Sequence, residues 1–138
     1  MKIQNSLISY QIEQQKINQI IQKLRNVERK VIAHEMAHKA VAGQYAGAVN
    51  YGYTKGPDGK MYITSGEVTL DMSEESTPEE TAKKMEIIQR AAMAPADPSP
   101  QDIRVAQSAA IKEMKARIEM EQNTRKGVKQ VSTFEIIV

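Results

Sequence analysis

The sequence predicts an α+β fold: a long N-terminal helix, a small antiparallel β segment and two C-terminal helices. Three observations support it. Residues 3–42 contain neither glycine nor proline and repeat apolar side chains at helical spacing. Residues 49–71 alternate apolar and polar side chains around a turn sequence, and two later segments begin with helix-start signals. At 138 residues, the chain is long enough for one modest core.

The predicted N-terminal helix is amphipathic. Apolar residues recur at steps of three and four from Ile17 to Val31, and the same stepping then reaches His34, His38 and Val41. Both histidines of the chain therefore lie on the face that should point inward. Gly43 follows as a residue that favours the end of a helix.

A β segment is predicted after this helix. Residues 49–54 and 61–64 read as two short strands, and residues 55–60 between them, Lys-Gly-Pro-Asp-Gly-Lys, favour a turn. Together they predict a β-hairpin. Residues 67–71 resemble a third short strand, which starts after Ser65-Gly66.

Two helices complete the predicted order. Thr77-Pro78 begins a helix that should end near Ala94, and Ser99-Pro100 begins another that should end between Asn123 and Gly127. The tail that follows is rich in β-prone residues. We therefore expect an N-terminal helical extension over 1–27, a main domain over 28–125 and a tail over 126–138.

Composition limits the function classes. The net charge of +2 gives no basic surface for nucleic acid, and no apolar run is long enough to cross a bilayer. The absence of cysteine excludes disulfides and Cys-type zinc sites. The first ten residues do not resemble a secretory signal, so a cytoplasmic location is expected, with export by a non-classical route left open.

The sequence His34-Glu35-Met36-Ala37-His38 matches the H-E-x-x-H pattern. Two histidines four residues apart on a helix lie one turn apart on the same face and can bind one metal ion, with zinc expected. Glu35 is the expected general base, because a nearby carboxylate can take a proton from a metal-activated water. The alternative is a buried, hydrogen-bonded histidine pair beside a solvent-exposed glutamate.

The third metal ligand should be a carboxylate, because no other histidine or cysteine is present. We favour Glu67, which follows a glycine at the start of an apolar strand, and place Asp71 next. Glu79 and Glu80 are already explained by a helix start. The remaining candidates are Glu74 and Glu75, in a polar loop, and Glu86.

Several other side chains have weaker functional interpretations. A tyrosine hydroxyl near the motif could stabilise an oxyanion, although packing in the hairpin and core is the favoured role for each tyrosine. Asp102 and Glu28 could support the ligand histidines, but a helix cap and a surface charge are the favoured roles. The tyrosines concerned are Tyr45, Tyr51, Tyr53 and Tyr62.

Taken together, these motifs resemble the SprA-related family of bacterial proteins, which are described as metalloprotease catalytic domains. The resemblance covers roughly residues 28–121: residues 31–38 with the H-E-x-x-H motif, residues 43–53, residues 56–62, Gly66-Glu67-Val68 with Asp71, and residues 94–102. Ser65 stands where the family pattern has a glycine. The resemblance implies a zinc peptidase in which His34 and His38 bind the metal, Glu35 is the acid/base and Glu67 is the third ligand.

The function expected from the sequence is therefore zinc-dependent hydrolysis of peptide bonds in a peptide or protein substrate. One alternative is a metal-stabilised scaffold that binds protein without turnover. Another is a helical interaction protein with buried histidines. The N-terminal helix could also pair with a second copy of itself, and neither nucleic acid nor a membrane is an expected partner.

Overall fold

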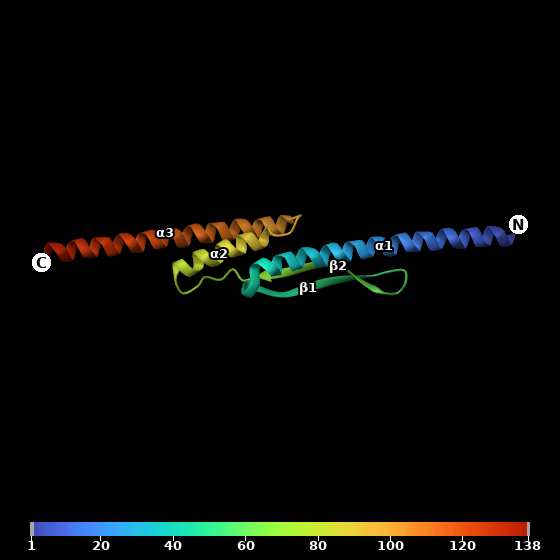
Figure 1. Ribbon diagram of the computed structural model, residues 1–138, viewed down its shortest axis with the longest axis horizontal. Coiled ribbons are helices and arrows are strands. Elements are labelled where there is room, and N and C mark those ends of the chain that lie inside the picture. The colour runs from blue at the N-terminus through green and yellow to red at the C-terminus, as the bar shows by residue number, and fades with distance from the viewer. Residues whose placement is uncertain (1, 138) are drawn as a thin grey trace. The chain divides into compact units, whose positions relative to one another are not determined.

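The structure is a computed structural model, and it describes the backbone of residues 2–137 and the side chains of residues 2–127. It confirms the α+β class (Figure 1). The elements follow the predicted order: α1 (Lys2–Ala42), a short 3₁₀ turn η1 (Gly43–Tyr45), β1 (Ala46–Lys55), β2 (Met61–Leu70), α2 (Pro78–Ala92) and α3 (Pro100–Ile137).

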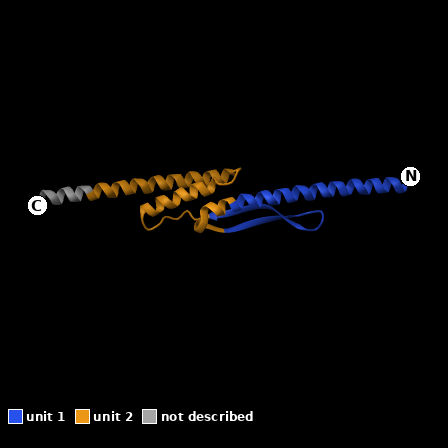
Figure 2. Ribbon diagram, viewed as in Figure 1, with its two compact units in different colours: residues 1–36, 48–69 blue, residues 37–47, 70–138 orange. Residues whose placement is uncertain are grey.

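The chain divides into two compact units, which Figure 2 shows in different colours. The first contains residues 1–36 and 48–69, and the second contains residues 37–47 and 70–138. The predicted domain limits at 27 and 125 fall inside α1 and α3, so neither coincides with the end of a helix.

Helix α1 runs unbroken for 41 residues, as the absence of glycine and proline predicts. It ends where expected, because Gly43 adopts a left-handed φ of 57° that side-chain-bearing residues disfavour. In its first turns Ile3, Leu7 and Tyr10 are exposed. The predicted self-association through this segment stays a prediction.

The hairpin differs from its prediction in one respect. Strands β1 and β2 form a two-stranded sheet, and β2 continues through Ser65-Gly66 to Leu70. The predicted third strand is therefore the second half of β2. The turn forms as expected: Gly59 has a φ of 80°, and Asp58 Oδ1 accepts a hydrogen bond from the amide of Lys60 at 3.2 Å.

Within the first unit, β2 runs along α1 in the same direction. The turn end of the hairpin lies by Leu24, because a Cβ atom built on Gly56 would be 3.2 Å from Cδ1 of Leu24. Farther along, Glu28 Oε2 accepts a hydrogen bond from the amide of Ile63 at 2.8 Å. Gly66 then reaches Glu35, so the hairpin covers α1 up to the H-E-x-x-H motif.

The second unit has its core between α2 and α3. Met85, Ile88 and Ala109 are fully buried there, because the small Ala109 side chain lets the two helices approach closely. Thr77 caps α2 by accepting a hydrogen bond from the amide of Glu80, as predicted. Partly buried side chains around this core are Tyr45, Leu70, Met72 and Val105.

The end of α3 corrects the sequence prediction. The helix does not stop between Asn123 and Gly127 but continues to Ile137. No proline follows Pro100, and a glycine in an exposed helix interior costs only about 1 kcal/mol relative to alanine, so Gly127 does not end the helix. Among the residues that the structure describes, no helix has the length and apolarity to cross a membrane.

Candidate metal centre

His38 lies at the junction of α2 and α3 in the second unit. It is only 4% exposed. Its Nδ1 lies 2.8 Å from the carbonyl oxygen of Ala91, in the last turn of α2. A carbonyl oxygen can only accept, so Nδ1 carries a proton and donates it. This hydrogen bond fixes the orientation of the ring and makes Nε2 the nitrogen that faces Asp102.

Asp102 reaches the other side of the same ring. It lies in the first turn of α3, where its Oδ2 accepts from the amide of Ser99 at 2.8 Å and its own amide donates to Ser99 Oγ at 3.1 Å. This reciprocal cap is the role expected from the sequence. The second carboxylate oxygen, Oδ1, is directed elsewhere and lies 3.2 Å from His38 Nε2.

The contact between His38 and Asp102 needs a proton or a metal ion between its two atoms. In the neutral imidazole that donates through Nδ1, Nε2 is an acceptor, and a carboxylate oxygen is also an acceptor. Two acceptors at 3.2 Å need either a shared proton or a metal cation between them.

His34 completes a three-residue group. Because α1 is unbroken, His34 stays one turn before His38 on the same helix. Possible ligand atoms of His34, His38 and Asp102 lie within 4.8 Å of one another. Tetrahedral zinc, with ligand bonds of about 2.0–2.2 Å, places neighbouring ligand atoms roughly 3.3–3.6 Å apart. Two imidazoles and one carboxylate are ligands that zinc accepts, so the donor types suit this metal, while atoms as far apart as 4.8 Å would have to move closer to bind it.

Glu35 is buried, with 4% of its surface exposed, and is not the solvent-facing glutamate of the alternative interpretation. Glu67, the favoured third ligand, lies elsewhere. Gly66 faces α1, and alternate residues of a strand point to opposite faces, so Glu67 points away from α1 and is exposed. The group with His34 and His38 takes its carboxylate from Asp102, which sequence reasoning had placed mainly as a cap.

Two of the other candidate acids bind an internal ammonium. Lys84 is fully buried, and its Nζ lies 3.0 Å from Asp71 Oδ2 and 2.9 Å from Glu75 Oε1. Hydrogen bonds from Ser73 and Lys84 hold the pKa of Asp71 well below its ordinary value. Burial alone would lower the pKa of Lys84, but its bonds to Glu75 and Asp71 outweigh burial and raise that pKa.

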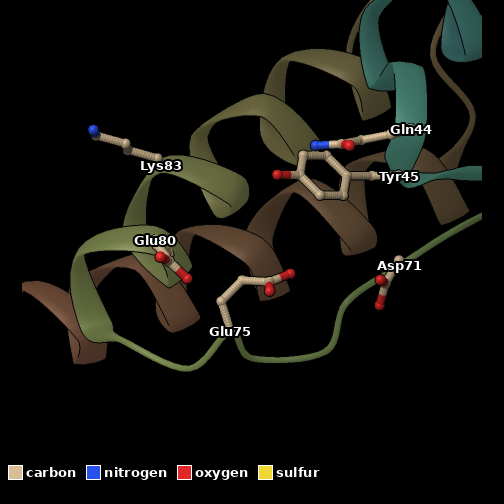
Figure 3. Close-up of a pocket in the computed structure, with 6 residues that line it drawn as sticks. All are labelled: Gln44, Tyr45, Asp71, Glu75, Glu80 and Lys83. Atoms are coloured by element: carbon tan, nitrogen blue, oxygen red, sulfur yellow. The ribbon is translucent and has the colours of Figure 1, made fainter.

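These acids also border a pocket of about 410 Å³ in the second unit. Figure 3 shows the carboxylates of Asp71, Glu75 and Glu80 on one side of it, the Tyr45 ring above Glu75, and Lys83 extending away from them. Because Lys84 already pairs with Asp71 and Glu75, the pocket presents less negative charge than its lining suggests. Another candidate, Glu86, pairs with Arg117 at 3.0 Å.

Of the four tyrosines near the motif, two make contacts that stabilise the fold and a third is exposed. Tyr62 donates a hydrogen bond to Asp58 in the hairpin turn. The Tyr45 ring lies under Lys84, with Nζ 5.2 Å from its centroid, and Tyr53 is 57% exposed. Tyr51 is the exception, because its ring lies beside Gly66 and hence close to Glu35.

The sequence analysis assigns no role to Lys84 and favours a surface position for Glu28, but the structure gives both residues internal contacts. Lys84 follows another lysine and suggests a surface charge, yet it shares the buried face of α2 with Thr81, Ile88 and Ala91. Its place on that face, three residues after Thr81 and four before Ile88, was the available signal. Glu28 is not a surface charge but accepts from the backbone of β2.

The model of the SprA-related family matches residues 2–138. The match extends beyond the segment of resemblance in the sequence and includes the first turns of α1. No curated protein and no solved structure matches the chain.

Proposed function

This chain belongs to the SprA-related family, and we propose that it is a zinc-dependent metallopeptidase. The observation that supports the proposal best is the pair formed by His38 and Asp102. Because Nδ1 donates to Ala91, Nε2 and Oδ1 can lie 3.2 Å apart only with a cation or a proton between them. His34, one turn away on the same helix, supplies a further imidazole.

In this proposal His34, His38 and Asp102 hold the metal. Asp102 replaces Glu67 as the carboxylate ligand, because Oδ1 of Asp102 already lies against His38 while Glu67 is exposed. Ala91 and Ser99 act in support: the first orients the His38 ring and the second orients the Asp102 carboxylate. Zinc, when bound, supplies Lewis acidity that polarises a substrate carbonyl and makes water a better nucleophile near neutral pH.

Glu35 has the proton-transfer role. Its carboxylate adjoins His34 in sequence and is shielded from bulk water, which strengthens its interaction with nearby positive charge. It takes a proton from the attacking water and returns it to the leaving amine, so that one carboxylate serves as base and then as acid.

The test is a peptide library incubated with zinc-loaded protein and read by mass spectrometry, with metal content measured on the same sample. The proposal expects about one zinc per chain and cleavage of some peptides. Glu35→Gln should keep the zinc and lose at least about 100-fold in rate. A wild-type protein that binds zinc but cleaves nothing would exclude the peptidase.

A second function has one observation in its favour. His38 is only 4% exposed and is held by both α2 and α3, which is also the arrangement expected where a metal stabilises a fold. A zinc-stabilised binding module would show a large rise in unfolding temperature with zinc and no cleavage. A peptidase would show cleavage that depends on Glu35.

A further inference from the structure

Strand β2 packs closely against α1 at Gly66, beside the H-E-x-x-H motif. A Cβ atom built on Gly66 would lie 3.0 Å from Cγ of Glu35, 3.1 Å from Cγ1 of Val31 and 3.2 Å from Cδ1 of Tyr51. All three distances are shorter than ordinary van der Waals contacts of about 3.5–4.0 Å between carbon atoms. Even a methyl group at position 66 would therefore displace at least one of these side chains.

The nearest of these atoms belongs to Glu35. Its Cγ is bonded directly to the carboxylate carbon, so any displacement of Cγ moves the carboxylate as well. Glu35 is buried, and a side chain in a packed interior has few alternative rotamers to accept. A side chain at position 66 would therefore move the Glu35 carboxylate from its present place.

We propose that Gly66 is a positioning residue for Glu35. Because Gly66 has no side chain, the Glu35 carboxylate can occupy the place that proton transfer requires. The inference rests on the proposed peptidase function. It also makes Gly66, and not Glu67, the residue of the Gly66-Glu67-Val68 segment that serves the site, because the glycine faces the motif while Glu67 points to solvent. Gly66 does not have a positive φ, so the backbone conformation does not require glycine here. Glycine is needed because α1 and β1 side chains come so close.

The inference predicts that a substitution at Gly66 lowers the rate of cleavage without changing zinc binding. Gly66→Ala should keep about one zinc per chain, because the three atoms nearest to a Cβ at position 66 belong to Glu35, Val31 and Tyr51 and not to a proposed ligand. It should lower kcat on a peptide that the wild type cleaves by roughly 10- to 100-fold with little change in KM, as expected when a catalytic group is misplaced. Adding Val31→Ala opens space beside the new methyl group and should recover part of kcat.

Gly52→Ala is the matched control in the same hairpin. A Cβ atom at Gly52 would meet the hydroxyl of Ser65, which is exposed and can rotate away. We expect kcat and zinc content close to wild type. If Gly66→Ala behaves like this control, or if Val31→Ala recovers nothing, the positioning role is wrong.

A second measurement needs no substrate and keeps the inference apart from the peptidase proposal. In urea unfolding, Gly66→Ala should lower the midpoint, and the loss should shrink by half or more when Glu35 is already Ala, because the crowded Cγ is gone. Equal losses in both backgrounds would overturn the inference. If the two substitutions are coupled but the wild type cleaves no peptide, the close packing of Gly66 against Glu35 is supported and only the peptidase proposal is rejected.

Discussion

The Nε2 atom of His38 lies 3.2 Å from Oδ1 of Asp102, while the opposite ring nitrogen donates to the carbonyl of Ala91. A histidine from the motif helix is thus held between the last turn of α2 and the first turn of α3. This relationship, and not the motif spacing alone, determines which carboxylate can share a cation with the histidines.

Asp102→Asn should weaken zinc binding at least 10-fold. The amide is isosteric and can still accept from Ser99, so the helix cap is kept while the negative charge is lost. Zinc affinity would be measured by competition with a chromogenic chelator. Glu67→Gln is the control, and its affinity should equal that of wild type. Weaker binding in Glu67→Gln than in Asp102→Asn would restore Glu67 as the third ligand.

Lys84→Met should destabilise the second unit by about 1–3 kcal/mol. The substitution keeps most of the apolar stem but leaves Asp71 and Glu75 without their shared ammonium. The estimate is at the lower end for a buried ion pair, because both carboxylates are partly exposed. Lys83→Met changes a neighbouring exposed lysine and should alter the free energy of unfolding by less than about 0.5 kcal/mol. Similar losses in the two variants would contradict the buried network.

Asp71 should make stability depend on acid pH. The pKa of Asp71 is lowered by its hydrogen bonds to Ser73 and Lys84, so the ionised carboxylate stabilises the fold above the ordinary value of 3.8. That contribution is lost as pH falls through the lowered pKa of the folded state. Asp71→Asn should therefore be less stable than wild type near pH 7, and the gap in urea midpoint should narrow between about pH 4 and pH 2. A gap of constant width would argue against this linkage.

Tyr62→Phe should destabilise the first unit by about 1 kcal/mol. Tyr62 is 5% exposed, and its hydroxyl donates to Asp58 in the hairpin turn, a bond that lowers the pKa of Asp58 and raises that of Tyr62. Without the hydroxyl, the turn loses the hydrogen bond that joins Asp58 to β2. Tyr53→Phe, at a side chain 57% exposed, should leave the thermal midpoint unchanged. Equal shifts would mean that the hydroxyl of Tyr62 contributes nothing specific.

Local sequence patterns were sufficient for most of the fold. The steps of three and four along α1, Gly43 after it, the Gly-Pro-Asp-Gly turn and the Thr77 cap each depend on residues a few positions apart, and each is found as predicted. The errors occurred where local signals are weak. Ser65-Gly66 looked like a break, but a glycine can continue a strand where another backbone comes close, and Gly127 did not end α3.

The motif itself was determined by the sequence, because helical geometry alone brings His34 and His38 to one face and places Glu35 beside them. The carboxylate that joins them was decided only by the tertiary structure. Asp102 has a complete local explanation as a cap, and nothing near it in sequence reveals that one of its two oxygens meets His38. The same holds for Lys84 and Gly66, whose roles depend on which atoms the folded chain brings within a few ångströms.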